Sequence, residues 1–442
     1  MISKTYIALN RLGLGISPQD LKNCGLNRTG WIESQINRGH AQFQAARLQH
    51  SSQIVSLIRQ TNMAKGEDRK PFVKKGREIH ANEMKARLDQ SLNSDTPFLE
   101  RLTYFWSNHF TVSTRGKNIL QSLVGSFERE AIRPHILGNF YDMLLASTTH
   151  PAMLIYLDNA QSIGPNSQAG TRRSRGLNEN LAREIMELHT LGVNGGYSQK
   201  DFTNFAKVLT GWNFKPENNG GNAFVFQDFR HEPGAQIILG RTYDQKGQDQ
   251  GLAVLRDLAR HSATAEFIAR KMVRHFIADD PPEDIVQELA NVFKTTGGDL
   301  KAMTRAMVSL KALFDEPYSK FKTPYELVIS TLRLNPKERD DKAYAVLAKT
   351  FVLMDHVPFA APSPAGWGDT ADDWASPNAV MNRVEWCHAT AQQVAPQSDP
   401  KQIAKELLGP LASIETLKWI GRAPSAVDGL ALFLASPEWQ RR

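Results

Sequence analysis

The sequence predicts an all-α protein, a mainly helical, single large domain over residues 1–442 with a small β-hairpin insertion. Apolar residues recur about every 3.6 positions in both halves of the chain, as they do on the buried face of a helix. No linker rich in Pro, Gly and Ser separates these segments, and no internal repeat is evident. Residues 213–245 instead alternate polar and apolar side chains, around Phe224–Phe226 and Ile237–Leu239, which predicts the hairpin.

Helix boundaries can be placed along much of the chain. Ser17-Pro18 and Thr96-Pro97 are typical of helix N-termini, because the hydroxyl can cap the first turn and Pro fits its first position. The mixed charges of residues 65–90 predict a solvated loop and helix face. Further helices are predicted over residues 119–131, 140–149, 151–156, 179–191, 252–276, 285–294, 300–314 and 325–332.

Composition indicates a soluble globular protein. Hydrophobic residues make up 41% of the chain and charged residues 22%, which is enough apolar material for a core. No apolar run reaches the ~18 residues of a membrane helix, and residues 1–11 lack the apolar run of a signal peptide, so we expect no membrane segment and a cytoplasmic start. A net charge of +7 is thin over 442 residues and gives no indication of nucleic-acid binding.

Several common functional motifs are absent from the sequence. The two cysteines, Cys24 and Cys387, support neither a disulfide framework nor a zinc module. A GxGxxG beginning at Gly13 fails because Pro18 takes the place of its third glycine. Gly116-Lys117 lacks the other residues of a phosphate-binding loop, and neither GxSxG nor HExxH occurs. A nucleotide-binding, serine-hydrolase or zincin function is therefore not predicted.

One predicted helix, residues 179–191, carries a constellation that could support chemistry. Asn180, Glu184 and Glu187 are spaced i, i+4 and i+7, which places them on one narrow face. That face borders the apolar stripe of the helix. Two carboxylates held there require either a raised pKa or a bound cation.

A divalent metal is the first expectation for such a site, because helical bundles build metal centres from inward-facing carboxylates and histidines. The further ligands considered are His109, Glu130, His135 and His150. His109 stands out because it is a polar residue on the aromatic stripe of the helix that begins at Thr96. The predicted metal ligands are Glu184, Glu187, His109 and His150, and the predicted catalytic residues are Glu184, Glu187 and His109.

Structural alternatives stay open for the same residues. Glu184 and Glu187 could pair with Arg183, Arg129 or Arg133 in an internal salt-bridge network, and His109 could be a hydrogen-bonded core histidine. His189 lies about half a helical turn from Glu187, so it is not expected to share a site with that carboxylate.

The segment of residues 161–176 is rich in Gly, Ser and Arg, and it predicts a mobile basic loop. Arg172, Arg173 and Arg175 lie just ahead of the carboxylate helix. The loop is either a cationic lid over an anionic substrate or a merely solvated surface loop. With Arg172 and Arg173, we predict Asn180, Arg183 and Asn108 as substrate-binding residues.

Long strings of the sequence together resemble the domain of unknown function 1800 (DUF1800) family over nearly the whole chain. They are Phe105-Trp106-Ser107-Asn108-His109-Phe110, Arg133-Pro134-His135-Ile136-Leu137-Gly138-Asn139-Phe140, residues 150–159, residues 178–192, Leu209-Thr210-Gly211-Trp212 and residues 436–442.

The resemblance implies a bacterial protein of a family without an established activity. It implies that Asn178, Glu179, Asn180, Arg183, Glu184 and Glu187 match the family's hallmark, as Asn108 and His109 match its Asn-His-Phe element and His231 a later histidine. Many members carry Phe at the position of His189. Many also carry an export signal and neighbour a gene of the domain of unknown function 1501 (DUF1501) family, which implies a partner and export with it.

Three hypotheses about function follow. The first is a metal-assisted or carboxylate-based enzyme, hydrolytic or oxidative, that uses Glu184, Glu187 and His109. The second is a non-catalytic binding or assembly protein that acts with a partner such as a DUF1501 protein, and the absence of standard catalytic motifs favours it. The third is binding of an anionic polymer through residues 172–175.

Overall fold

The computed structural model confirms the all-α class. Helices make up 65% of the protein, and its described strands form two small antiparallel sheets. The structure describes residues 2–39, 43, 48–172, 176–216, 223–335, 339–393 and 399–442. Most of the buried apolar side chains form one hydrophobic cluster that extends from Ile7 to Trp439. No helix in the described ranges is long and apolar enough to cross a membrane.

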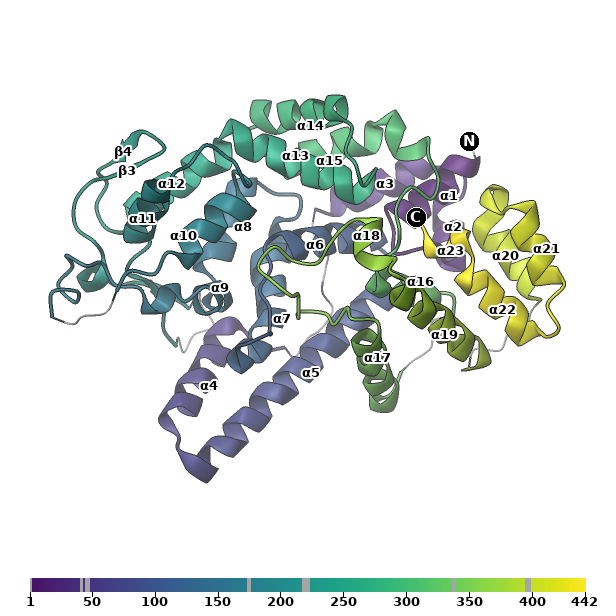
Figure 1. Ribbon diagram of the computed structural model, residues 1–442, viewed down its shortest axis with the longest axis horizontal. Coiled ribbons are helices and arrows are strands. Elements are labelled where there is room, and N and C mark those ends of the chain that lie inside the picture. Colours follow the sequence, from purple (N-terminus) through teal and green to yellow (C-terminus); the bar gives the residue numbers. More distant parts are fainter. Residues whose placement is uncertain are drawn as a thin grey trace.

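The N-terminal part of the chain supplies the centre of the molecule and a projecting helical pair, α4 and α5 (Figure 1). Ser17 caps α2 as predicted, since its Oγ accepts a hydrogen bond from Asp20 N at 3.1 Å. The helices are α1 Ile2–Arg11, α2 Pro18–Cys24, α3 Arg28–Arg38, α4 Ser51–Met63, α5 Lys70–Asn93, α6 Pro97–His109, α7 Val124–Phe127, α8 Phe140–Thr149 and α9 Pro151–Tyr156. Short 3-10 turns lie at Gly66–Arg69, Asn118–Ser122, Arg133–His135 and Asn159–Gln161.

Two predicted helices are less regular than expected. The segment over 119–131 is a 3-10 turn, the single turn α7, and a π-helical turn, Glu128–Ile132. The segment over 179–191 is α10, Asn180–Glu184, followed by a second π-helical turn, Ile185–His189. Thr190 Oγ1 donates to the carbonyl oxygen of Ile185 at 2.7 Å, a reach of five residues that fits the wider π turn. π turns of this kind are rare and occur often at functional sites.

The predicted insertion holds two strand pairs instead of one hairpin. After α11, Gln199–Val208, strand β1 Trp212–Phe214 pairs with β2 Phe224–Phe226, with Asn213 opposite Val225. Strand β3 Gln236–Ile238 then pairs with β4 Arg241–Tyr243. A 3-10 turn at Asp228–Arg230 lies between the two pairs.

The second half of the chain is helical again. Helices α12 to α15 run along one side of the molecule, and α20 to α22 lie together near the C-terminus, where α22 packs against α19 (Figure 1). The elements are α12 Gln248–Arg260, α13 Ser262–Phe276, α14 Glu283–Thr295, α15 Leu300–Ser309, α16 Pro324–Leu332, α17 Asp341–Leu353, α18 Ala371–Trp374, α19 Pro377–Gln393, α20 Pro400–Leu408, α21 Ile414–Gly421, α22 Ala426–Ala435 and α23 Pro437–Gln440, with 3-10 turns at Lys311–Phe314 and Gly409–Leu411.

Helix α6 lies between α13 and α16, and aromatic packing fixes this arrangement. Phe105 of α6 packs against Phe276 of α13, with ring centroids 6.1 Å apart. Tyr104, the preceding residue of α6, packs edge-on against Tyr325 of α16 at 5.1 Å. Neighbouring residues of α6 thus contact α13 and α16. Side chains of α5, α13 and α16 therefore lie close together around the C-terminal half of α6.

Candidate active site

The carboxylate helix lies at the border of the core, as predicted, and Glu187 finds an arginine partner. Arg183 Nη1 lies 3.6 Å from Glu187 Oε1, and the Arg183 guanidinium stacks over Phe202 at 4.3 Å. Burial, and then the charge of Glu187, raise the pKa of Glu184, while Arg183 opposes them. Asn180 is exposed, and its backbone N–H donates to Asn178 Oδ1 at 2.9 Å.

His109 is buried in an aromatic shell and contacts the other buried histidine of this region. Its Nε2 donates to the carbonyl oxygen of His189 at 3.1 Å, and the two rings lie 6.2 Å apart. Burial, then Lys271 and His189, lower the pKa of His109 well below its usual value. His109 is therefore neutral, and its Nδ1 has no hydrogen-bond partner among the described residues. This arrangement agrees with a core histidine better than with a ligand shared with Glu184.

The other proposed ligands occupy separate places. His150 caps α9, because its Nδ1 accepts from Ala152 N at 3.1 Å, and its Nε2 lies 3.5 Å from Glu130 Oε2. Burial raises the pKa of Glu130, but His150 and Ser51 outweigh it and lower that pKa to about 2. Burial lowers the pKa of His135.

The four predicted metal ligands do not form a metal cluster. Within the described ranges, no group of three or more His, Cys, Asp or Glu side chains is placed to hold an ion. The predicted set of Glu184, Glu187, His109 and His150 therefore gains no support from the geometry.

Much of the predicted mobile basic loop is held against the insertion. Ala169 N donates to the carbonyl oxygen of Phe229 at 2.9 Å, and Asn166 donates to Glu232 through its backbone N–H at 2.9 Å and through Nδ2 at 2.6 Å. Arg172 is exposed. Arg173 and residues 174 and 175 lie outside the described residues, so their predicted role stays a prediction.

Replacing His189 by Phe is expected to make the protein less sensitive to mild acid. Burial and Lys271 lower the pKa of His189 to about 3, whereas an unfolded histidine titrates near 6.5. The folded pKa is the lower one, so the stability that neutral His189 contributes is complete above about pH 6.5 and declines as the pH falls. Between pH 8 and pH 5 the variant should gain about 2 kcal/mol relative to the wild type, as measured by urea unfolding.

The phenyl ring keeps the packing of position 189, and the backbone oxygen that His109 uses is unchanged. The exposed His388 offers a matched control, since its replacement by Phe should leave the pH dependence unaltered. A difference between His189→Phe and wild type that is the same at both pH values would contradict this assignment.

A cavity of about 110 Å³ opens between α5, α6, α13, α16 and the segment of residues 356–369. Its aromatic lining includes Tyr104, Tyr325, His356, Phe359 and Trp367, and its ionisable lining includes Arg87, His275, Glu326 and Asp369. Asn108 is the one predicted site residue in this lining. A concave, mostly apolar space with a few convergent polar groups is typical of small-molecule sites.

A histidine–aspartate pair lies in the lining of the cavity. His275 Nδ1 lies 2.8 Å from Asp369 Oδ2. Burial raises the pKa of Asp369, but His275 and Lys320 outweigh it and lower that pKa, so the carboxylate is ionised and can only accept a hydrogen bond. Nδ1 of His275 therefore carries the proton. Nε2 presents a lone pair, is buried, and has no hydrogen-bond partner among the described residues.

The surroundings of this pair hold it in place. Burial lowers the pKa of His275, with Asp369 opposing, so the imidazole is neutral near pH 7. The carbonyl oxygen of His275 accepts from Arg442 Nη1 at 2.9 Å. Lys320 Nζ donates to the carbonyl oxygen of Asp369 at 2.5 Å and to the carboxylate of Asp279. Asp369 thus orients the imidazole through Nδ1, while the contacts of Arg442 and Lys320 hold the backbone of the two residues.

The loop that carries Asp369 has unusual backbone geometry. Asp355 and Phe359 adopt left-handed conformations, with φ of 49° and 61°, and Gly366 has φ of 89°. A Cβ at Gly366 would lie 2.5 Å from Asn108 Oδ1. Asn108 Nδ2 donates to Trp367 O at 2.9 Å, and Trp367 N donates to Asn108 Oδ1 at 2.7 Å. Asn108 thus holds the wall of the cavity, and strained residues of this kind cluster at functional sites.

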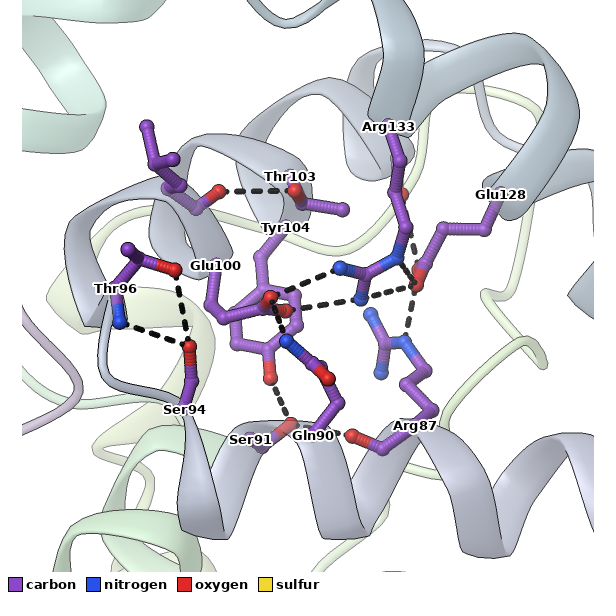
Figure 2. Close-up of polar contacts among 12 residues, drawn as sticks. Arg87, Gln90, Ser91, Ser94, Thr96, Glu100, Thr103, Tyr104, Glu128 and Arg133 are labelled. Atoms are coloured by element: carbon purple, nitrogen blue, oxygen red, sulfur yellow. Dashed lines mark hydrogen bonds and ion pairs between the residues drawn. The ribbon is translucent and has the colours of Figure 1, made fainter. Parts of the chain in front are cut away.

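A buried ion network holds Arg87, a residue of the cavity lining, in place (Figure 2). Glu128 accepts from Arg87 Nε at 2.8 Å and from Arg133 Nη2 at 3.0 Å. Arg133 Nη1 also donates to Glu100 at 2.9 Å. Burial raises the pKa of Glu128, but Arg87 and Arg133 outweigh it and lower that pKa. The network joins α5, α6 and the π turn of residues 128–132.

Sequence reasoning missed His275, Asp369 and Arg87. The observation that singled out His109, a polar residue on an apolar helical stripe, also applies to His275, which stands beside Met272 and Phe276 on α13. Asp369 lies 94 residues away in a loop, and no local pattern joins the two.

The fold and the cavity define a large, mainly helical protein with a buried histidine–aspartate pair at an internal pocket. The chain belongs to the family described as protein of unknown function (DUF1800), whose model matches residues 7–441, so the resemblance of the sequence is confirmed. No curated protein and no solved structure matches the chain.

Proposed function

We propose that this protein is an enzyme that uses His275 as a general base, and that its reaction is hydrolytic. One observation carries the proposal: Nε2 of a buried, aspartate-bound histidine has no described partner while the residue lines a cavity. In the proposed reaction, Nε2 accepts a proton from a water molecule as the water oxygen attacks an electrophilic carbon of the substrate. The imidazolium then returns this proton to the leaving group.

The hydrolytic class is preferred over the oxidative one because the polar groups of the cavity supply proton transfer. Asp369 stabilises the imidazolium that forms, and its contact with His275, followed by the charge of Lys320, keeps the carboxylate ionised. The aromatic walls lower the polarity around the reacting atoms, which strengthens each electrostatic interaction within the cavity.

The test is a panel of chromogenic esters, amides and glycosides. We expect turnover of at least one class by the wild type and a loss of about 10²- to 10⁴-fold in His275→Gln, since that is the usual contribution of a general base. Unchanged turnover in His275→Gln would contradict the proposal. Absence of turnover across the panel would favour the binding or assembly hypothesis.

Glu184 and Glu187 with His109 stay the alternative catalytic proposal, with Asn180, Arg183, Arg172 and Arg173 as its substrate contacts and a divalent metal as its cofactor. The raised pKa of Glu184 supports it, because carboxyl groups whose pKa is shifted by burial and by a neighbouring like charge are often acids or bases in active sites. Glu184→Gln in the same panel separates the two sites. The substitution should abolish turnover if Glu184 is catalytic, and turnover should remain intact if the reaction takes place in the His275 pocket.

The assembly hypothesis, with a DUF1501 protein as partner, has support of its own. Exposed apolar side chains gather on α17 and α19, which are joined where Asn382 Nδ2 donates to Leu353 O at 3.1 Å. They are Val346, Val352, Leu353, Val380, Met381 and Val384. Exposed apolar groups of this kind often mark protein interfaces.

A further inference from the structure

We propose that Arg87 is the anchor for a substrate carboxylate, so that the pocket takes small carboxylic acids with an aromatic or apolar body. The inference rests on the proposed function for the reaction itself, but the binding step can be tested alone. It follows from the hydrogen bonds of Arg87, from its aromatic surroundings and from its place in the same cavity as His275.

Arg87 has donors that the protein does not use. Arg87 is only 9% exposed, and its Nε donates to Glu128 Oε2 at 2.8 Å. Figure 2 shows no contact at its two terminal nitrogens, and no hydrogen bond of Nη1 or Nη2 to any described residue is found. Arg133, in the same network, uses Nε, Nη1 and Nη2. Arg87 therefore presents the unused end of its guanidinium at the cavity.

Aromatic rings fix the position of this guanidinium. It lies over Tyr104 at 4.7 Å, Phe359 at 4.9 Å and Tyr325 at 5.0 Å. Burial lowers the pKa of Arg87, but Glu128 outweighs it, so the side chain remains charged. Because Glu128 engages Nε, Nη1 and Nη2 remain as a pair of parallel donors, and the rings restrict the movement of the guanidinium. Such a pair matches the two oxygens of a carboxylate.

The other charged groups of the cavity are already paired. Glu326 accepts from Arg101 and lies 3.1 Å from Arg442 Nε, and Asp369 is bound to His275. Arg87 thus remains the charged group with free donors in the lining, and the lining next to it is aromatic. A ligand with a carboxylate at Arg87 would extend its apolar part along Tyr325 and Trp367 and its reacting bond toward His275.

Benzoate and benzamide are suitable probes, because they share size and shape and differ in charge. We expect the full-length wild type to bind benzoate by isothermal titration calorimetry and to bind benzamide at least 10-fold more weakly. Arg87→Lys should weaken benzoate binding at least 10-fold, since Lys keeps the charge beside Glu128 but has no planar fork. Arg129→Lys is the matched control, because Arg129 pairs with Glu83 outside the pocket, and it should bind like the wild type.

His275→Gln separates this inference from the proposed function. If the His275→Gln variant binds benzoate like the wild type and also keeps normal turnover, His275 is not the general base, and the carboxylate site at Arg87 is still supported. The inference is overturned if the wild type does not bind benzoate, if benzamide binds as tightly, or if a folded Arg87→Lys binds benzoate normally. The comparison of the two probes on the wild type needs no variant, so it decides the matter even if Arg87→Lys does not fold.

Discussion

Glu128→Gln is expected to lower the free energy of unfolding by about 3–5 kcal/mol, the usual cost of removing one partner from a buried ion pair. Glu128 accepts from Arg87, Arg133 and Ser107, and its side chain is 3% exposed. An amide has one acceptor oxygen, and it would turn its own N–H groups toward a guanidinium. The buried positive charges of Arg87 and Arg133 would then lack the negative charge that balances them. Urea unfolding at pH 7 measures the change.

The pH dependence provides a second criterion. The folded pKa of Glu128 is depressed, so its contribution is present above the unfolded pKa of about 4.3 and is lost as the pH falls below it. The difference between wild type and variant should therefore shrink below about pH 4. Glu78→Gln is the control: Glu78 pairs with Lys75 on the exposed face of α5, where such pairs contribute about 0–1 kcal/mol. A loss at Glu128 as small as that at Glu78 would contradict the importance of the network.

The fold could be predicted because its causes are local. Periodic apolar residues define most helices, and the first turns depend on neighbouring residues such as Ser17 and Pro18. The two π turns could not be predicted in this way. In the turn over Ile185–His189, the Thr190 hydroxyl donates to the carbonyl oxygen of Ile185. The sequence alone does not show which of several nearby carbonyl oxygens this hydroxyl binds.

The predicted contacts agree with the structure where they depend on spacing along one helix. Arg183 and Glu187 are spaced i, i+4 and lie together in the structure. This contact is one of the salt bridges considered as a structural alternative to a catalytic site. The helical-wheel position of His189 excluded its side chain from the Glu187 site, yet its backbone oxygen is the partner of His109. The pairs Arg87–Glu128 and His275–Asp369 join elements distant in sequence, and their contacts depend on the packing of α6 between α13 and α16.

Asp369→Asn is expected to reduce turnover by about 10²- to 10⁴-fold while leaving the fold intact. The Asp369 carboxylate can only accept, so it fixes the proton of His275 on Nδ1 and leaves Nε2 free to act as a base. An amide can donate to Nδ1 instead, which would move the ring proton to Nε2 and abolish the base. It also removes the negative charge that opposes the lowering of the pKa of His275 by burial.

Two measurements test this expectation. The turnover of whichever panel substrate the wild type hydrolyses should fall in Asp369→Asn and remain normal in Asp372→Asn, an exposed neighbour on α18. Independently of any substrate, the ¹⁵N chemical shifts of His275 should show the ring proton on Nδ1 in the wild type and on Nε2 in the variant. If the proton stays on Nδ1 and turnover stays within a factor of three, Asp369 does not orient the base. The unpartnered Nε2 would then have to be explained by packing alone.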